Sequence, residues 1–256
     1  MNVSKVIRAL LGRNPVMAKY RCNVCDHKVW KFLPFGRGSK SVPAFVRAIN
    51  LTGSDVDNFE CPWCGASDRE RHLLMYMRAS GLFDSLAGKE ILHFAPEKRI
   101  AGLVAAQNPR RHIQADLKPT RLDIERIDMQ EIPYPDESFD LVIANHVLEH
   151  VSDDLLALQE LRRVLKVNGH AILQTPFSSK VHNTWYDRGI DDDESRLQAY
   201  GQEDHVRLFG KDIFDRIASS GLTSKVQLHD ELLPDVNART FGVNRSEPFF
   251  LFERTA

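Results

Sequence analysis

The stretch that decides the fold is Ile127–His150, which reads IDMQEIPYPDESFDLVIANHVLEH. Within it, Phe139–Ala144 is a short apolar run rich in strand-forming residues, and it predicts a buried strand. A helix is predicted to follow, with Ser152 as its N-cap and Gly169 placed to end it. Another short apolar run, Ala171–Gln174, comes next. A strand, a helix and a strand within about 40 residues predict a βαβ unit with parallel strands.

The segment before this unit repeats the same alternation. Glu90–Phe94 and His112–Asp116 are predicted strands with a helix, Lys98–Ala106, between them, and a short third strand is predicted over Ile124–Ile127. Rossmann-like folds place a glycine-rich loop after the first strand, so that the backbone can approach a ligand. Here Ala95–Glu97, with the sequence Ala-Pro-Glu, occupies that place. A ligand held here must therefore depend more on side chains than on close backbone approach.

The order of these motifs resembles the class I S-adenosylmethionine-dependent methyltransferases of the type 11-like group. The resemblance rests on Asp128-Met129, on Pro135–Asp140, on Val147–Val151 and on Arg163–Gly169. It extends to a bacterial group with a cysteine-rich N-terminus, a His-Phe-Ala-Pro-Glu first loop and a late Gly-Gln-x-Asp-His-Val-Arg motif, here Cys61–Gly65, His93–Glu97 and Gly201–Arg207. The resemblance implies an α/β fold: a Rossmann-like seven-stranded methyltransferase sheet with a small N-terminal zinc-ribbon-like module.

Six residues are candidates for binding S-adenosylmethionine. Asp116 lies 23 residues after His93, where such folds place a carboxylate that binds ribose hydroxyls. By resemblance, Asp128 would accept from the adenine amino group. The other candidates are Glu97 toward the ammonium end, Leu117 and Met129 beside the adenine, and Asn145 at the end of the fourth strand. For several of them a structural role remains open: a helix start for Glu97, a strand-end or turn-capping role for Asp116 and Asp128, and core packing for Leu117.

Two histidines are candidates for the base that an oxygen or nitrogen acceptor needs. His146 follows the fourth strand, and His205 follows a long polar segment that runs to about residue 203, the position of a substrate lid. Asp204 is expected to orient the ring of His205, and Arg207 to hold an anionic acceptor. The alternatives are that His205 anchors the loop and that His146 makes only structural contacts.

Four cysteines form two Cys-x-x-Cys pairs: Cys22 with Cys25, and Cys61 with Cys64. Two residues between thiols let both sulfurs bind one metal, and two such pairs complete a tetrahedron. The spacing predicts structural zinc, because four sulfur ligands leave no open position for catalysis. Disulfide or redox pairs and unrelated thiols are the alternatives.

Composition is that of a globular protein, with 43% apolar and 27% charged residues among 256. Net charge is −1, yet residues 1–50 contain ten Lys or Arg and a single acid, Asp26. This basic region makes RNA an alternative partner to a small-molecule or glycan-like acceptor. No run approaches the roughly 20 apolar residues of a membrane span, and no signal peptide is predicted, so a cytoplasmic location is expected.

The sequence predicts four parts: a basic arm (1–19), a zinc-ribbon-like module (20–67), a connecting helix (68–86) and a methyltransferase domain (87–256). The expected function is methyl transfer from S-adenosylmethionine to an oxygen or nitrogen of a small-molecule or glycan-like acceptor. Two alternatives remain: a zinc-ribbon RNA methyltransferase, and a non-catalytic zinc-containing binding protein. The fourth strand lacks the Asn-Pro-Pro-aromatic group typical of methylation at exocyclic base amines, which disfavours RNA.

Overall fold

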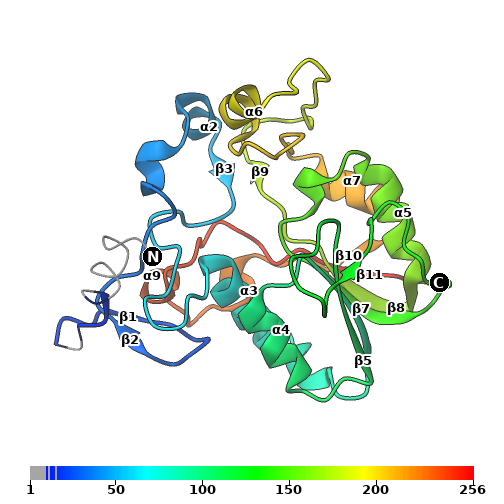
Figure 1. Ribbon diagram of the computed structural model, residues 1–256, viewed down its shortest axis with the longest axis horizontal. Helices are drawn as coiled ribbons and strands as arrows, with labels where there is room; N and C mark the ends of the chain where they lie inside the picture. The colour runs from blue at the N-terminus through cyan, green and yellow to red at the C-terminus, as the bar shows by residue number, and fades with distance from the viewer. Residues whose placement is uncertain (1–9, 11, 15) are drawn as a thin grey trace. The chain divides into compact units, whose positions relative to one another are not determined.

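The computed structural model describes residues 10, 12–14 and 16–256, so most of the predicted basic arm lies outside the described residues (Figure 1). The chain forms two compact units. The first comprises Met1–Val42, Gly53–Phe83 and Leu228–Pro248; the second comprises Pro43–Thr52, Asp84–Gln227 and Phe249–Ala256. These bounds differ from the predicted domains, because Leu228–Pro248 was expected within the methyltransferase domain and instead packs with the N-terminal residues. No helix in the described ranges is long and apolar enough to cross a membrane.

The second unit is built on a seven-stranded sheet in the order β10-β11-β8-β7-β4-β5-β6. The strands are β4 (Glu90–Phe94), β5 (Arg111–Asp116), β6 (Glu125–Arg126), β7 (Phe139–Ala144), β8 (Leu165–Ile172), β10 (Thr223–Ser224) and β11 (Leu251–Glu253). The pairs from β6 to β8 are parallel, whereas β11 is antiparallel to both of its neighbours. This arrangement confirms the predicted fold, and β4 and β7 have the predicted bounds.

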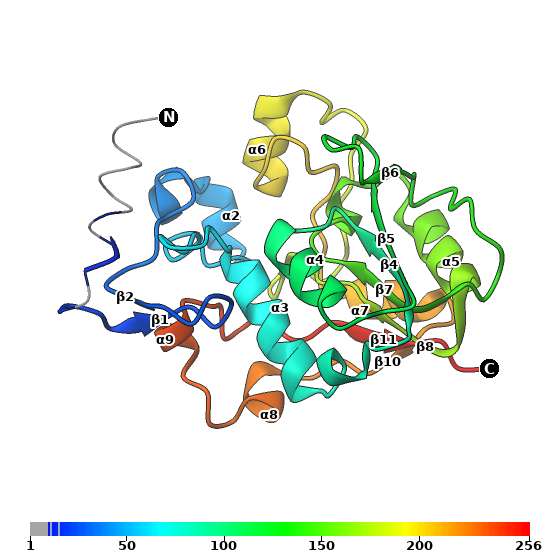
Figure 2. The same ribbon diagram turned by 60° about the horizontal axis from the view of Figure 1, so that its bottom comes forward.

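Helices cover both faces of this sheet. Figure 2 shows α4 (Lys98–Ala105) and α5 (Asp154–Val164) on opposite faces. The chain reaches β5 on one side of β4 and returns to β7 on the other, and right-handed crossovers then require helices on opposite faces. A third helix, α7 (Ile213–Ser219), packs against α5. The core lies between these helices and the sheet; Leu158, Leu161 and Phe250 are fully buried in it.

The ends of α5 differ from the prediction. The N-cap is Asp153, whose side chain accepts from the Leu156 N–H at 3.0 Å, while the Ser152 hydroxyl donates to Gln130 instead. The helix ends at Val164 and β8 begins at the next residue, so Gly169 lies inside a strand. A Cβ at Gly169 would lie 2.8 Å from the Lys166 carbonyl oxygen. Glycine is therefore required there by close backbone approach rather than by a helix end.

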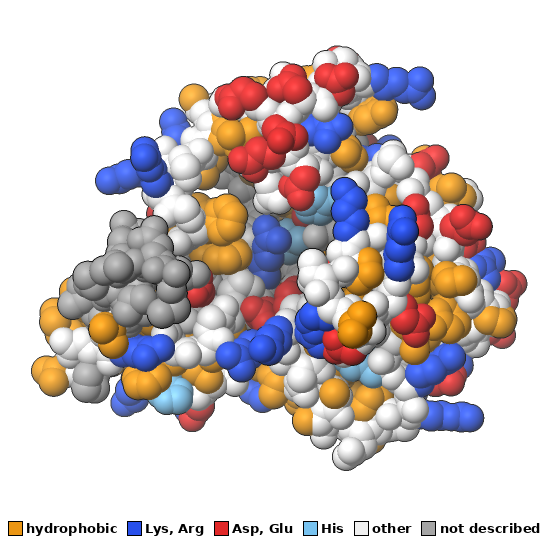
Figure 3. All heavy atoms as spheres, in the orientation of Figure 1, with side chains coloured by type: hydrophobic (Ala, Val, Ile, Leu, Met, Phe, Trp, Pro, Cys, Tyr) orange, Lys and Arg blue, Asp and Glu red, His pale blue; other side chains and the backbone are white. Residues whose placement is uncertain are grey.

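The predicted lid segment is more ordered than expected. It contains β9 (Phe177–Ser178), paired antiparallel with β3 (Leu51–Thr52), and α6 (Asp193–Tyr200), which packs on α2 (Ala44–Ala48). Figure 3 shows acidic side chains gathered over α6 and the loop before it. These acids, Asp191–Glu194, are exposed, and Asp192 caps α6 by accepting from the Ser195 N–H. The acidic run is therefore a solvated helix start.

The first unit has a small hairpin, β1 (Tyr20–Arg21) with β2 (Lys28–Val29), beside α3 (Asp68–Ala79). Ser67 and Glu70 form a capping box that starts α3. The short helices α8 (His229–Leu232) and α9 (Ala238–Phe241) complete the unit. Two 3-10 turns, η1 (Gly38–Ser41) and η2 (Phe83–Ser85), lie between its main elements, and a third, η3 (Leu148–His150), follows β7 in the second unit.

The side chain of Arg71 on α3 ties the first unit together. Its guanidinium is fully buried and donates to five backbone carbonyls, those of Asn58, Phe59, Ala66, Phe241 and Gly242. It also lies 3.8 Å over the ring of Phe32. Because two of its acceptors come from the α9 region, this one side chain explains why a C-terminal segment packs with the N-terminal residues.

Candidate active site

A pocket of about 600 Å³ lies at the carboxyl ends of β4, β5 and β7. In open parallel sheets ligands bind at this edge, at the point where successive connections leave in opposite directions. Here that point lies between β4 and β7, since β5 follows β4 on one side and β7 adjoins it on the other. The pocket walls come from the loops after these three strands, from the loop after β6 (Glu125–Arg126) and from the segment around α6.

Four of the predicted cofactor residues line this pocket: Asp116, Leu117, Asp128 and Met129. Asp116 ends β5, and one of its carboxylate oxygens accepts from the Lys118 N–H at 2.8 Å. Asp128 likewise accepts from the Gln130 N–H at 2.9 Å. Each carboxylate accepts a hydrogen bond within its own turn, as a turn-capping residue does. The same hydrogen bond also fixes the side chain at the pocket wall. Leu117 is half exposed to the pocket, whereas Met129 is buried.

The other two predicted cofactor residues, Glu97 and Asn145, do not line the pocket. The Asn145 side-chain amide donates to Glu97, and Nε2 of His93 lies 3.3 Å from the same carboxylate. Glu97 thus joins the ends of β4 and β7. In this arrangement its oxygens meet protein groups, and a contact with a cofactor ammonium group remains a prediction.

The loop after β4 adopts a strained backbone conformation without glycine. Ala95 has φ +43°, in the left-handed region where glycine is favoured. The pocket wall includes this residue. The loop therefore makes the tight turn that Rossmann-like folds use. Because alanine stands where glycine is usual, the left-handed backbone conformation costs folding free energy.

Replacing Ala95 with glycine should relieve that cost. We expect Ala95→Gly to raise the free energy of unfolding by up to about 1 kcal/mol, because the left-handed conformation costs alanine roughly 1–2 kcal/mol and glycine loses more entropy on folding. Urea unfolding measures this. The matched control, Ala105→Gly at an exposed position in the last turn of α4, should lower stability by up to about 1 kcal/mol. Equal destabilisation by both variants would contradict the strain argument.

Histidine side chains lie around the carboxylate of Glu149, beside the pocket. His146, also in the left-handed region at φ +56°, places Nδ1 3.3 Å from Oε1 of Glu149. Nε2 of His205 lies 4.0 Å from the same oxygen, and the rings of His150 and His205 meet edge to face with centroids 4.8 Å apart. His146 and His150 line the pocket, whereas His205 and Glu149 are buried behind its surface.

Burial and charge set the protonation of these groups. Burial lowers the pKa of His205 to about 4, although the Glu149 carboxylate opposes the shift, so the ring is neutral near pH 7. Burial alone would raise the pKa of Glu149, but hydrogen bonding with His146 and the nearby histidines lower it to about 2. The site therefore combines a neutral imidazole with an ionised, buried carboxylate.

The late Gly201–Arg207 motif is what brings His205 to Glu149. The Val206 N–H donates to the Glu149 carbonyl at 2.9 Å, which aligns the two segments. Arg207 forms an ion pair with Asp154 and donates to the carbonyls of Val151 and Ser152. The prediction that Arg207 holds an anionic acceptor is not supported, because its guanidinium is buried and fastens the start of α5. Asp204 lies 3.3 Å from Nδ1 of His150, so it orients that ring rather than His205.

The pocket lining includes residues that were not predicted as site residues, among them His150 and Arg196. His150 lines the pocket from η3; in the sequence only the Val-Leu-Glu-His motif indicates it, and that motif is equally consistent with a structural role. Arg196 lines it from α6, and its Nε is buried without a hydrogen-bond partner among the residues that the structure describes. No sequence pattern indicates Arg196 as a pocket residue, because acidic residues dominate that stretch of the sequence.

The four cysteines converge in the first unit. Cys22 Sγ lies 3.8 Å from Cys64 Sγ, and Cys25 Sγ lies 3.9 Å from Cys61 Sγ. All four sulfurs are within 4.8 Å of one another, and none forms a disulfide. Sulfurs bound tetrahedrally to zinc at about 2.3 Å are about 3.8 Å apart, so the donor set fits zinc.

The backbone around the cysteines repeats one turn twice. Asp26 N–H donates to the Cys22 carbonyl and Gly65 N–H to the Cys61 carbonyl, and both donors have positive φ, +62° and +78°. Arg71 supplies a buried positive charge: burial lowers its pKa, and Asp68 with the Cys22 and Cys61 sulfurs counters the shift. Four thiolates around one zinc carry a net charge of −2, which this cation offsets.

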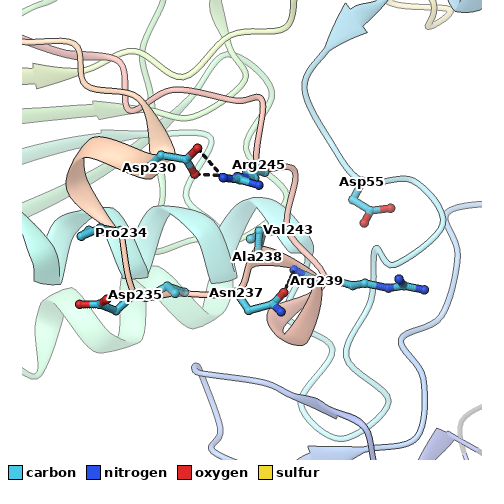
Figure 4. A pocket seen from close by; sticks show the side chains of 10 residues that line it. Asp55, Asp230, Pro234, Asp235, Asn237, Ala238, Arg239, Val243 and Arg245 are labelled. Atoms are coloured by element: carbon cyan, nitrogen blue, oxygen red, sulfur yellow. Dashed lines mark hydrogen bonds and ion pairs between the residues drawn. The ribbon is translucent and has the colours of Figure 1, made fainter.

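A second pocket, of about 540 Å³, lies in the first unit (Figure 4). Asp230 and Arg245 face each other across it in a paired ion bridge, and Asn237 and Arg239 approach from α9. Asp230 and Arg245 are already paired with each other at the surface, and none of the predicted site residues lines this pocket.

Part of the chain is similar in sequence to known methyltransferases. Residues 83–173 match the family model described as Methyltransferase domain. A probable S-adenosylmethionine-dependent methyltransferase of Mycolicibacterium smegmatis is 29% identical over 118 residues, covering 41% of this chain and 44% of that protein. The malonyl-(acyl-carrier protein) O-methyltransferase of Halorhodospira halophila is 29% identical over 102 residues, covering 39% and 31%. An S-adenosylmethionine-dependent methyltransferase structure from Mesorhizobium loti covers 69% of this chain and 94% of its own, with 16% identity and a TM-score of 0.44.

The sheet order and the family match identify residues 83–173 as part of a class I S-adenosylmethionine-dependent methyltransferase domain. The chain spans less than half the length of the two curated relatives, so their acceptors do not carry over.

Proposed function

We propose that the protein transfers a methyl group from S-adenosylmethionine to an oxygen or nitrogen of a small-molecule or glycan-like acceptor. The observation that carries this proposal is the pocket at the carboxyl ends of β4, β5 and β7, with Asp116 and Asp128 on one part of its wall and His146 and His150 on another. The carboxylates suit the adenosine part of the cofactor, and the histidines suit the reacting end.

In this reaction the methyl group passes directly from the cofactor to the acceptor, so the protein itself forms no covalent bond. The acceptor atom forms a bond to the methyl carbon as the carbon–sulfur bond breaks, and the electron pair of that bond neutralises the sulfonium. The product is S-adenosylhomocysteine, and a neutral acceptor must also lose a proton. His146 lines the pocket and is therefore the better placed of the two predicted bases, whereas His205 is buried against Glu149.

The buried Nε of Arg196 supports an acceptor with an anionic group. A buried Nε–H without an acceptor at a pocket wall costs free energy unless a ligand supplies the acceptor atom. A carboxylate or phosphate matches its fork geometry. RNA remains the alternative acceptor, and a comparison of glycans, small acids and RNA as substrates, with radiolabelled methyl transfer as readout, separates them.

We also propose one structural zinc ion, held by Cys22, Cys25, Cys61 and Cys64 in the first unit, and a cytoplasmic location. The convergence of the four sulfurs supports the zinc, and because none of the four forms a disulfide, they fit a reducing compartment. The zinc would fix the two cysteine turns to each other and to α3, and it leaves no open coordination position for chemistry.

Cofactor binding is tested by calorimetry with S-adenosylhomocysteine. We expect Asp116→Ala to weaken binding by about 1–3 kcal/mol, or roughly 5- to 150-fold, because a charge-assisted hydrogen bond to the ribose is lost. Asp123→Ala is the matched control: it removes an exposed carboxylate from the loop after β5 that pairs with Arg121 and does not line the pocket. Equal affinity of wild type and Asp116→Ala would remove Asp116 from the cofactor site.

A further inference from the structure

Three side chains beside the pocket bring potential metal ligands together. One ligand atom from each of Glu149, His150 and His205 lies within 4.8 Å of the other two. We call these three residues the His/Glu cluster. Glu149 and His205 are buried, and His150 is partly exposed at the pocket wall. Neither the methyltransferase fold nor the proposed methyl transfer requires this grouping.

Backbone carbonyls fix the tautomer of both imidazoles. Nδ1 of His150 lies 3.2 Å from the Asp204 carbonyl oxygen, and Nδ1 of His205 lies 3.3 Å from the Tyr200 carbonyl oxygen. A carbonyl oxygen only accepts, so each neutral ring carries its hydrogen on Nδ1 and its lone pair on Nε2. This is the arrangement of metal-binding histidines, whose second nitrogen donates to a carbonyl or carboxylate.

The remaining atoms of the cluster face one another as acceptors. The Nε2 lone pair of His205 lies 4.0 Å from Oε1 of Glu149. Within the described part of the chain, neither this Nε2 nor Oε2 of Glu149 makes a hydrogen bond. A buried carboxylate that meets a lone pair is costly unless a cation lies between them. Nδ1 of His146, 3.3 Å from Oε1, holds the carboxylate from its other side.

We propose that the His/Glu cluster binds one divalent transition-metal ion through Nε2 of His150, Nε2 of His205 and a carboxylate oxygen of Glu149. Metal–ligand distances of about 2.0–2.2 Å bridge atoms separated by 4.0 Å with only small movements. Two imidazoles and one carboxylate suit manganese, iron, cobalt or zinc, in contrast to the four-sulfur site of the first unit.

The position of His150 gives the metal a role. Three protein ligands leave coordination positions open, and His150 lines the pocket, so an open position faces the acceptor. This step rests on the proposed function: the acceptor would bind the metal through its hydroxyl oxygen, and the metal would favour transfer of the hydroxyl proton to His146 before methyl transfer. The cluster therefore favours an acceptor with a hydroxyl group as the methylated atom.

Manganese is the probe that separates this site from the cysteines, because thiolates disfavour it. Titration of purified, zinc-containing protein with Mn²⁺, followed by electron paramagnetic resonance, should show one bound Mn²⁺ per chain. Glu149→Gln keeps the side-chain shape and His150→Ala changes a partly exposed residue, and each should weaken Mn²⁺ binding at least about tenfold. Glu203→Gln and His182→Ala, which alter exposed residues outside the cluster, should bind Mn²⁺ like wild type.

Two results would overturn the metal site: no Mn²⁺ uptake by folded wild-type protein, or unchanged uptake by both cluster variants. Calorimetry with S-adenosylhomocysteine on the same samples separates this proposal from the proposed function. Protein that binds S-adenosylhomocysteine but no Mn²⁺ refutes only the metal site. Protein that binds Mn²⁺ in a cluster-dependent way but no S-adenosylhomocysteine refutes only the methyltransferase proposal.

Discussion

Replacing His205 with alanine should lower the methylation rate by roughly 10- to 100-fold and leave affinity for S-adenosylmethionine nearly unchanged. The residue contacts Glu149 and packs on His150, and it does not line the pocket where the adenosine residues lie. Its loss should therefore affect activation of the acceptor and not cofactor binding. His205 thus acts through the His/Glu cluster as a positioning residue.

A purely structural role predicts a different pattern. The ring is buried and its Nδ1–H donates to the Tyr200 carbonyl, so His205→Ala should also cost stability, about 1–3 kcal/mol. The decisive experiment measures two quantities for His205→Ala: the single-turnover rate, well below the melting temperature, and the melting temperature itself. His182→Ala, an exposed histidine in the same unit, is the control and should change neither quantity. A lower melting temperature with a near-normal rate would remove His205 from the reaction.

The centre of the sheet could be predicted because β4 and β7 are buried on both faces. Such strands are continuous apolar runs, so the bounds of β4 and β7 followed directly from Glu90–Phe94 and Phe139–Ala144. The end of α5 could not be predicted in the same way. Leu165 continues the helical leucine pattern, yet it begins β8, and Gly169 resembles a helix end although close strand backbones are what require it.

Site residues at strand ends were also accessible from sequence, whereas those that depend on long-range contacts were not. Asp116 and Asp128 line the pocket because their positions follow from the strands. The inward orientation of Glu149 depends on the 3-10 turn η3 and on a segment more than fifty residues later, which no local pattern reveals. The return of Leu228–Pro248 to the first unit depends similarly on the contacts of Arg71 with Phe241 and Gly242.

Replacing Cys61 with serine should abolish zinc binding and unfold the first unit. The Cys61 sulfur is buried among three other thiols, and serine cannot replace a thiolate ligand. Apparent binding free energies of structural zinc reach about 10–16 kcal/mol in small zinc domains, comparable with or larger than the whole stability of a typical domain. Loss of the metal would also leave the buried charge of Arg71 without its compensating thiolates.

Metal analysis of purified protein should therefore find one zinc per chain in wild type and none in Cys61→Ser. Glu60→Gln changes the preceding side chain and keeps all four thiols, so it should retain the zinc. Proteolysis is expected to cut the first unit of Cys61→Ser rapidly, because its α3 and cysteine turns lose their common anchor. The sheet of the second unit contains none of the four cysteines and should stay resistant. The zinc site would be refuted if folded wild-type protein contained no zinc and its four thiols reacted freely with a thiol reagent.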